Sequence, residues 1–157
     1  MKKIKGIGDG NIFGLKLVQS VARRYLKEQI IGENYIQSSE NVLDYLRHNL
    51  RARGREVFLV VLLNGRNQVL DIVELFEGTL TTSAVYPREV IKLILEKDAA
   101  AVIFVHNHPS RNPNPSKDDQ NLTLKLKAAC STIDVQLHDH LIIAGNDYTS
   151  MADKGMV

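Results

Sequence analysis

The stretch "AAAVIFVHNHPSRNPNPSKDDQ", residues 99–120, decides how the centre of this chain folds and raises the question of its function. It begins with an apolar, partly β-branched run, which is typical of a strand buried on both faces. Three prolines follow and exclude regular structure. Ser116 then opens a helix predicted to run to about residue 132. The segment therefore predicts a strand, a turn and a helix, with two histidines, a serine and two aspartates at the junction.

Helices and strands alternate on both sides of this segment. Residues 55–75 predict a β-hairpin around an "NGRN" turn, and Pro87 marks the first turn of a helix. A helix over residues 40–52, capped by Ser38 or Ser39, precedes the hairpin, and a strand over 133–144 follows the central helix. This order predicts an α/β fold in which helices flank a mixed β-sheet.

Composition limits the class of protein. The chain has 157 residues, 44% of them hydrophobic and 24% charged, which is typical of a soluble globular domain. No apolar run approaches the roughly 20 residues of a membrane span, and the N-terminal lysines precede no signal-peptide core. The single cysteine, Cys130, excludes an internal disulfide and a multi-cysteine metal site. We therefore expect a cytoplasmic protein that makes no membrane contact.

The two histidines of the central segment are spaced for metal binding. Alternation along a strand places His106 and His108 on one side and Asn107 on the other. Their Cα atoms then lie about 6.6 Å apart, at roughly 3.3 Å per residue, so both imidazoles can reach one zinc ion. Asp119 would be the third ligand. The alternative is that Ser116 and Asp119 only form a capping box at the start of the helix.

Three protein ligands and one open position are typical of a catalytic zinc site, whereas structural sites close all four positions. Such a site needs a general base on a neighbouring element. Glu56, the acid at the edge of the apolar run "EVFLVVLL", is the candidate. The alternative for Glu56 is a solvated charge at a strand end, next to Arg55.

The order Glu56, His106-x-His108, seven residues, Ser116-x-x-Asp119 resembles the JAMM metal motif of the JAB/MPN superfamily. The segments "GTLTTSAVYPREVIKLILEKDAAAVIFVHNHPSRNPNPSKDD" and "LHDHLIIAGNDYTSMADKG" resemble the bacterial RadC family, over about residues 38–155. One departure is Arg111, where the family commonly has glycine. The resemblance implies a cytidine-deaminase-like fold and a RadC-type JAB/MPN metal-binding domain over residues 38–157.

The resemblance also implies a function and roles for the site residues. His106, His108 and Asp119 would bind Zn²⁺, and Glu56 would move the proton of the water on the metal. Ser116 would donate a hydrogen bond to the oxyanion. The expected activity is that of a zinc-dependent hydrolase of the metallopeptidase type, which attacks a peptide or isopeptide carbonyl with a metal-bound water. Its partner would be a peptide or protein substrate.

The front of the chain, residues 1–30, resembles the second half of a helix-hairpin-helix module, and residues 31–37 are interpreted as a linker. A turn at Gly6-Ile7-Gly8 and a helix of roughly 15 residues after Gly14 carry this likeness. Residues 1–55 have a net charge of +6 and residues 56–157 one of −4. The module implies a weak, sequence-independent DNA contact through Lys5, Gly6 and Gly8. Ile12 stands where the module usually has alanine and the module's first helix is missing, which predicts a truncated remnant.

Two other functions remain as alternatives. The chain would be a DNA-repair-associated accessory protein if its metal site is structural or vestigial, or an interaction scaffold if it binds no metal; the intact ligand set argues against the scaffold. The adjacent letters "HNH" do not indicate an HNH nuclease, which distributes those residues over a ββα unit. A zinc deaminase needs two further cysteines.

A second histidine pair lies in "LHDHLIIA". Alternation predicts that His138 and His140 share a strand face, where they would form a second metal pair. We favour a structural interpretation, for which the sequence suggests no physical role.

Overall fold

The computed structural model describes residues 9–78 and 85–157. Its described elements are, in chain order, α1 Asp9–Ile30, α2 Ser39–Leu50, β1 Glu56–Leu63, β2 Val69–Gly78, α3 Pro87–Glu96, β3 Ala101–Asn107, α4 Lys117–Ser131, β4 Gln136–Ala144 and β5 Asp147–Ser150. The strands form a five-stranded sheet in the order β2-β1-β3-β4-β5. β3 and β4 are parallel, and the other neighbouring strands are antiparallel. The predicted α/β fold with a mixed sheet is confirmed.

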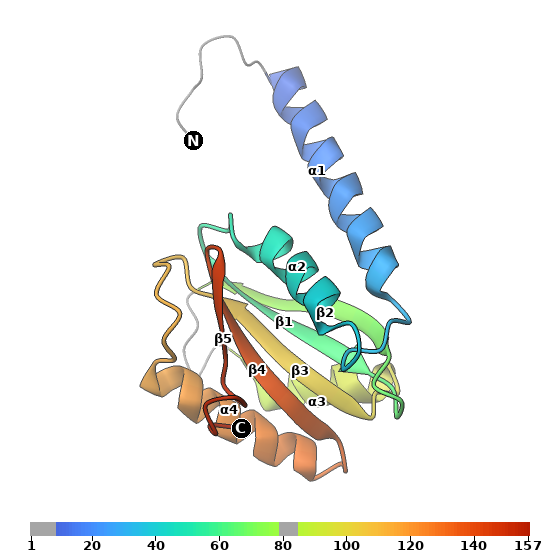
Figure 1. The fold of residues 1–157 in the computed structure, drawn as a ribbon, viewed down its shortest axis with the longest axis vertical. Helices are drawn as coiled ribbons and strands as arrows, with labels where there is room; N and C mark the ends of the chain where they lie inside the picture. The colour runs from blue at the N-terminus through green and yellow to red at the C-terminus, as the bar shows by residue number, and fades with distance from the viewer. Residues whose placement is uncertain (1–8, 79–84) are drawn as a thin grey trace.

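The apolar run of β1 is continuous because both faces of the sheet are covered. α2 covers one face, whereas α3 and α4 cover the other (Figure 1). Alternate β1 residues such as Leu59 and Val61 pack in the cluster that includes Leu46 of α2. The intervening residues, such as Phe58 and Val60, pack in the cluster of α3 and α4. Burial on both faces explains why this strand shows no alternation of apolar and polar residues.

The connection from β3 through α4 to β4 positions the site. Because β3 and β4 are parallel, α4 crosses back over the sheet and begins near the end of β3. The C-terminal end of β3 carries His106 and Asn107, and the N-terminal turn of α4 carries Asp119. The strand, turn and helix predicted from residues 99–120 are confirmed, and their junction brings the polar side chains together.

Helix α1 differs from the prediction and from the rest of the fold. We expected it to begin after Gly14, but it begins at Asp9 and contains that glycine. A glycine inside a helix costs about 1 kcal/mol relative to alanine and does not prevent the helix. α1 extends away from the sheet (Figure 1), and Phe13, Leu15 and Val18 are each more than half exposed. Its C-terminal end is fixed by the buried Ile30.

Residues 31–37, interpreted as a linker, are bonded to the β1–β2 turn. The Gly32 N–H donates to the Val69 carbonyl and the Tyr35 N–H to the Asn67 carbonyl, both at 2.8 Å. Ser38 occupies the N-cap of α2 but its side chain makes no capping bond; its hydroxyl donates to Glu33 Oε2 at 3.0 Å. The predicted cap is therefore wrong for its side chain.

Two expectations concern contact with DNA and with membranes. The DNA contact was expected through Lys5, Gly6 and Gly8, which lie outside the described residues. None of the helices in the described ranges has the length and apolar character that crossing a bilayer requires.

Candidate metal centre

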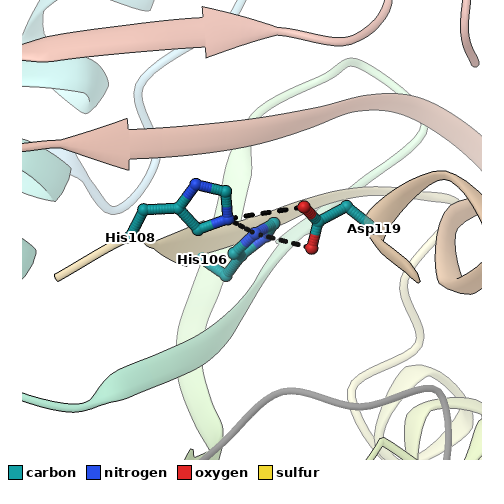
Figure 2. Close-up of side chains that lie close together, drawn as sticks. All are labelled: His106, His108 and Asp119. Carbon is teal, nitrogen blue, oxygen red and sulfur yellow. Dashed lines mark hydrogen bonds and ion pairs between the residues drawn. The ribbon is translucent and has the colours of Figure 1, made fainter. Parts of the chain in front are cut away.

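Three side chains meet at the junction of β3 and α4. His106 Nε2 lies 3.0 Å from His108 Nε2 and 3.1 Å from Asp119 Oδ1. His108 Nε2 lies 3.4 Å from Asp119 Oδ2. Figure 2 shows the two rings turned toward the carboxylate. The structure thus brings together the three residues that the sequence predicts as metal ligands, and ligand atoms of all three lie within 4.8 Å of one another.

The spacing of these atoms fits a single ion. Ligand atoms about 2.0–2.1 Å from a tetrahedral zinc lie roughly 3.3 Å from one another. The two histidine nitrogens lie 3.0 Å apart, and each lies 3.1 or 3.4 Å from a different oxygen of the Asp119 carboxylate. Two imidazole nitrogens and one carboxylate oxygen also form a ligand set that zinc accepts. The donor set and its spacing therefore fit a divalent metal ion.

The capping box of α4 fixes Asp119. The Ser116 hydroxyl accepts from the Asp119 N–H at 3.1 Å, and Asp119 Oδ2 accepts from the Ser116 N–H at 2.7 Å. The Ser116 hydroxyl also donates to Oδ2 at 2.7 Å. The predicted capping box is confirmed, and it orients the same carboxylate that faces the histidines. Capping and metal binding are therefore compatible.

Contact between Asp119 and the histidines shifts the pKa values in the cluster. Burial alone would raise the pKa of the Asp119 carboxyl, but hydrogen bonds from His106, His108 and Ser116 outweigh burial and hold that pKa well below its usual range. The bond to Asp119 in turn raises the pKa of His108, and the Glu56 charge adds to this shift. A site that favours an ionised carboxylate between imidazoles also favours a cation at the same point.

The tautomer of His108 follows from its second nitrogen. Its Nδ1 lies 2.7 Å from the Asn112 carbonyl oxygen, which only accepts hydrogen bonds. Nδ1 therefore carries a hydrogen, and loss of the Nε2 hydrogen that bonds to Asp119 would leave a neutral ring with its Nε2 lone pair toward the cluster. Such a contact on the far side of the ring is usual for a metal-binding histidine.

Glu56 starts β1, which pairs with β3. Phe58 pairs with His106, so alternation along β1 places Glu56 on the face of the two histidines. Asn107 points to the other face, as predicted, and its amide spans the backbone on either side of Glu56. Asn107 Oδ1 accepts from the Val57 N–H at 2.7 Å, and its Nδ2 donates to the Arg55 carbonyl at 3.0 Å. Asn107 therefore fixes the backbone that carries the predicted base.

The prediction that His138 and His140 share a face of their strand is wrong. Val102 pairs with Leu137 whereas Ile103 pairs with Asp139, so His138 is an extra residue in a β-bulge. His138 Nε2 instead contacts Asn67 Oδ1 at 2.7 Å. A second metal pair is excluded because the bulge directs the two rings to different partners.

His140 lies fully buried beside the metal cluster. Its Nε2 is 2.8 Å from His106 Nδ1, and its Nδ1 is 2.6 Å from the Thr123 hydroxyl. Burial, and then the nearby His106, lowers the pKa of His140 well below its ordinary value. The neighbouring Asp139 holds the bulge, since its carboxylate accepts from Ser150 Oγ and from the Ala152 N–H. The structure thus gives His138 and His140 the contacts that the sequence did not suggest: His138 with Asn67, and His140 with His106 and Thr123.

Two surface cavities are lined by residues of the candidate site. One of about 580 Å³ is lined by Glu56, Gly78 and Ser110 among others. A second of about 320 Å³ includes His108 and Arg111. Arg111 has a φ of 62°, a left-handed conformation that glycine adopts without strain. This conformation explains why glycine suits that position.

The fold and the cluster define an α/β domain with a candidate His-His-Asp metal site at the end of a central strand. A sequence model described as the RadC-like JAB domain matches residues 36–156. A UPF0758 protein of Idiomarina loihiensis is 43% identical over 97% of this chain and 68% of its own length. UPF0758 proteins of Shewanella baltica and Nitrosomonas eutropha are each 41% identical over 99% of the chain and 69% of their own lengths. The chain belongs to the RadC-like JAB domain family.

Sequence reasoning missed three residues of the site: Asn107, Thr123 and His140. A signal existed for Thr123, because Asp119 and Thr123 are four residues apart on a helix and so share a face. The position of His140 had no such signal, since it depends on a bulge in β4.

Proposed function

We propose that this domain is a zinc-dependent hydrolase of the metallopeptidase type, which cleaves a peptide or isopeptide bond. The observation that carries the proposal is the convergence of His106 Nε2, His108 Nε2 and the Asp119 carboxylate. The order of these residues, with Glu56 and Ser116, follows the motif expected of this family. A zinc ion in this position would acidify a water ligand and polarise the carbonyl of the scissile bond.

Glu56 is the proposed proton carrier. It lines the cavity of about 580 Å³, which Pro109 and Ser110 also line and where an extended peptide would be bound. Its carboxylate would accept a proton as the oxygen of water bonds to the carbonyl carbon. It would then return this proton to the amide nitrogen as the carbon–nitrogen bond breaks. Asn107, bonded to the backbone on both sides of Glu56, would hold the backbone that carries this carboxylate during the transfer.

Ser116 is the proposed oxyanion donor. Its hydroxyl now donates to Asp119 Oδ2, so the hydrogen must turn toward the substrate when negative charge develops on the carbonyl oxygen. The Ser116 N–H still donates to Asp119 after that change, so the carboxylate keeps its orientation. A single serine would thereby hold a metal ligand by its backbone and stabilise the transition state by its side chain.

Metal content provides the first test. Chain purified without chelator or a polyhistidine tag, and measured by mass spectrometry, is expected to contain about one zinc per chain. His106→Ala should contain none. His48→Ala is the matched control, because His48 is exposed and its Nδ1 lies against the Asp44 carbonyl of its own helix. Wild-type protein that remains metal-free after incubation with zinc would contradict the proposal.

The hydrolytic step is tested separately with Glu56→Gln. This variant should bind zinc like the wild type but lose cleavage of peptide and isopeptide substrates by at least about 100-fold, since general-base catalysis contributes that much. Full activity in Glu56→Gln would remove Glu56 from the mechanism without removing the metal site.

A further inference from the structure

A buried chain of hydrogen bonds connects the two metal-binding elements behind the cluster. It runs from the Asp119 carbonyl oxygen to Thr123 Oγ1 at 2.6 Å, and from there to His140 Nδ1 at 2.6 Å. His140 Nε2 then lies 2.8 Å from His106 Nδ1. Thr123 and His140 are both 0% exposed, so water does not replace any of these partners. This series of hydrogen bonds starts at the backbone of one candidate ligand, Asp119, and ends at the ring of another, His106.

Each step of this chain has one direction. The Asp119 carbonyl only accepts, so the single hydroxyl hydrogen of Thr123 points to it. The Met151 sulfur, 3.6 Å away, is a weak competing acceptor. Thr123 Oγ1 must therefore accept from His140, which places a hydrogen on His140 Nδ1.

The environment of His140 determines its other nitrogen. Its ring packs edge-on against Phe58 and Phe104, with centroids 5.8 and 6.0 Å away, and it forms no ion pair among the described residues. A charged ring without an ionic partner is unfavourable in such a site, so the neutral form is expected. Nε2 of neutral His140 then has a lone pair, which accepts a hydrogen from His106 Nδ1.

We infer that Thr123 and His140 are positioning residues that fix the tautomer of His106 for metal binding. With a hydrogen held on Nδ1, the neutral form of His106 would offer a metal ion the lone pair of Nε2, the atom that lies 3.1 Å from Asp119 Oδ1. His108 obtains the same tautomer from one backbone carbonyl. His106 obtains it through two intervening side chains, which end on the backbone of its fellow ligand. This inference rests on the proposed metal site.

Zinc affinity gives the first test, measured by competition with a chromophoric chelator on the full chain. Loss of an outer contact of this kind typically weakens metal binding about 10–100-fold, and we expect that loss in His140→Leu and Thr123→Val. His140→Gln should stay within about threefold of the wild type, because its amide oxygen can take the place of Nε2 as acceptor. Thr132→Val is the control, since Thr132 makes the same kind of bond, to the Ala129 carbonyl of α4.

The tautomer itself is measured in metal-free protein, by two-bond ¹⁵N–¹H correlation spectra of the histidine rings. His106 is expected with its hydrogen on Nδ1 in the wild type and in His140→Gln, and to lose this preference in His140→Leu. This spectrum keeps the inference testable if a variant does not fold, because it needs only the wild type.

The outcomes separate the two proposals. If the wild type binds zinc and folded His140→Leu and Thr123→Val bind it equally well, the positioning role is wrong while the metal site stands. If the wild type binds no zinc, the proposed function is wrong, and the spectrum alone decides the hydrogen-bond chain. A His106 Nδ1 that carries no hydrogen in the metal-free wild type would overturn the inference in either case.

Discussion

The metal cluster and helix α1 show two different ways in which a segment is held. Around the cluster, His106, His140 and Thr123 are hydrogen-bonded across three elements, and all three are fully buried. α1 has 22 residues, yet several of its large apolar side chains are exposed. Because packing of an apolar face usually stabilises a helix more than its propensity does, α1 depends on local interactions over most of its length. The difference predicts large mutational effects in one region and small ones in the other.

The largest contrast is expected for one substitution made in both regions. Leu46 of α2 is fully buried, and Leu46→Ala should lower the free energy of unfolding by about 2–5 kcal/mol. Leu15 of α1 is 63% exposed, and Leu15→Ala should change it by less than about 0.5 kcal/mol. Urea denaturation followed by circular dichroism measures both. Similar losses in the two variants would show that the exposed face of α1 is packed in solution.

Zinc should sharpen the contrast, because it stabilises only the state that contains the assembled site. At free zinc 100 times the dissociation constant, the gain in stability is about 2.7 kcal/mol. Asp119→Asn should lose most of this gain in thermal melts with and without zinc. Asp118→Asn is the control, since Asp118 is the exposed neighbour of the ligand on the same helical turn. Equal zinc stabilisation in both variants would exclude Asp119 as a ligand.

The fixed end of α1 should respond to acid. Burial would raise the pKa of Asp71, but its bonds to Lys27 of α1 and to Lys97 outweigh burial and lower that pKa. A carboxyl with a lowered folded-state pKa contributes stability above its unfolded pKa of about 3.9, and this contribution is lost as the pH falls through the folded value. Hydrogen-exchange protection at the C-terminal end of α1 should therefore decrease below about pH 4.

In Asp71→Asn, hydrogen-exchange protection at the C-terminal end of α1 should already be lower at neutral pH. It should also no longer decrease when the pH is lowered. Glu28→Gln is the control, since Glu28 pairs with Arg24 on the exposed surface of α1 itself. Protection at the end of α1 that is unchanged in Asp71→Asn would mean that this carboxylate does not hold the helix.

The accuracy of the sequence predictions follows the range of the interactions. The strand, turn and helix of residues 99–120 were predictable because an apolar run and the Ser116–Asp119 capping pattern act over a few residues. The faces of His138 and His140 were not, because the bulge is set by pairing with β3 and by the bonds of Asp139 to residues near the C-terminus. The start of α1 was misplaced because Gly14 was interpreted as a boundary. Gly14 lies within the helix, where a side chain at this position would meet no other element among the described residues.

The smallest expected effect concerns the loop between the two elements of the cluster. Arg111 and Gly145 both have positive φ, of 62° and 69°, and the Arg111 side chain lies against that glycine. A left-handed conformation costs a residue other than glycine roughly 1–2 kcal/mol, whereas glycine loses more entropy on folding. Arg111→Gly should therefore raise the free energy of unfolding by about 1 kcal/mol or less.

Gly145→Ala should lower the free energy of unfolding by about 1 kcal/mol through strain alone, because the added Cβ would lie 3.6 Å from the arginine, an ordinary contact. Urea denaturation measures both changes in the free energy of unfolding. An increase in Arg111→Gly and a decrease in Gly145→Ala would show that backbone conformation governs both positions. A decrease in both variants would mean that packing of the arginine outweighs the strain at residue 111.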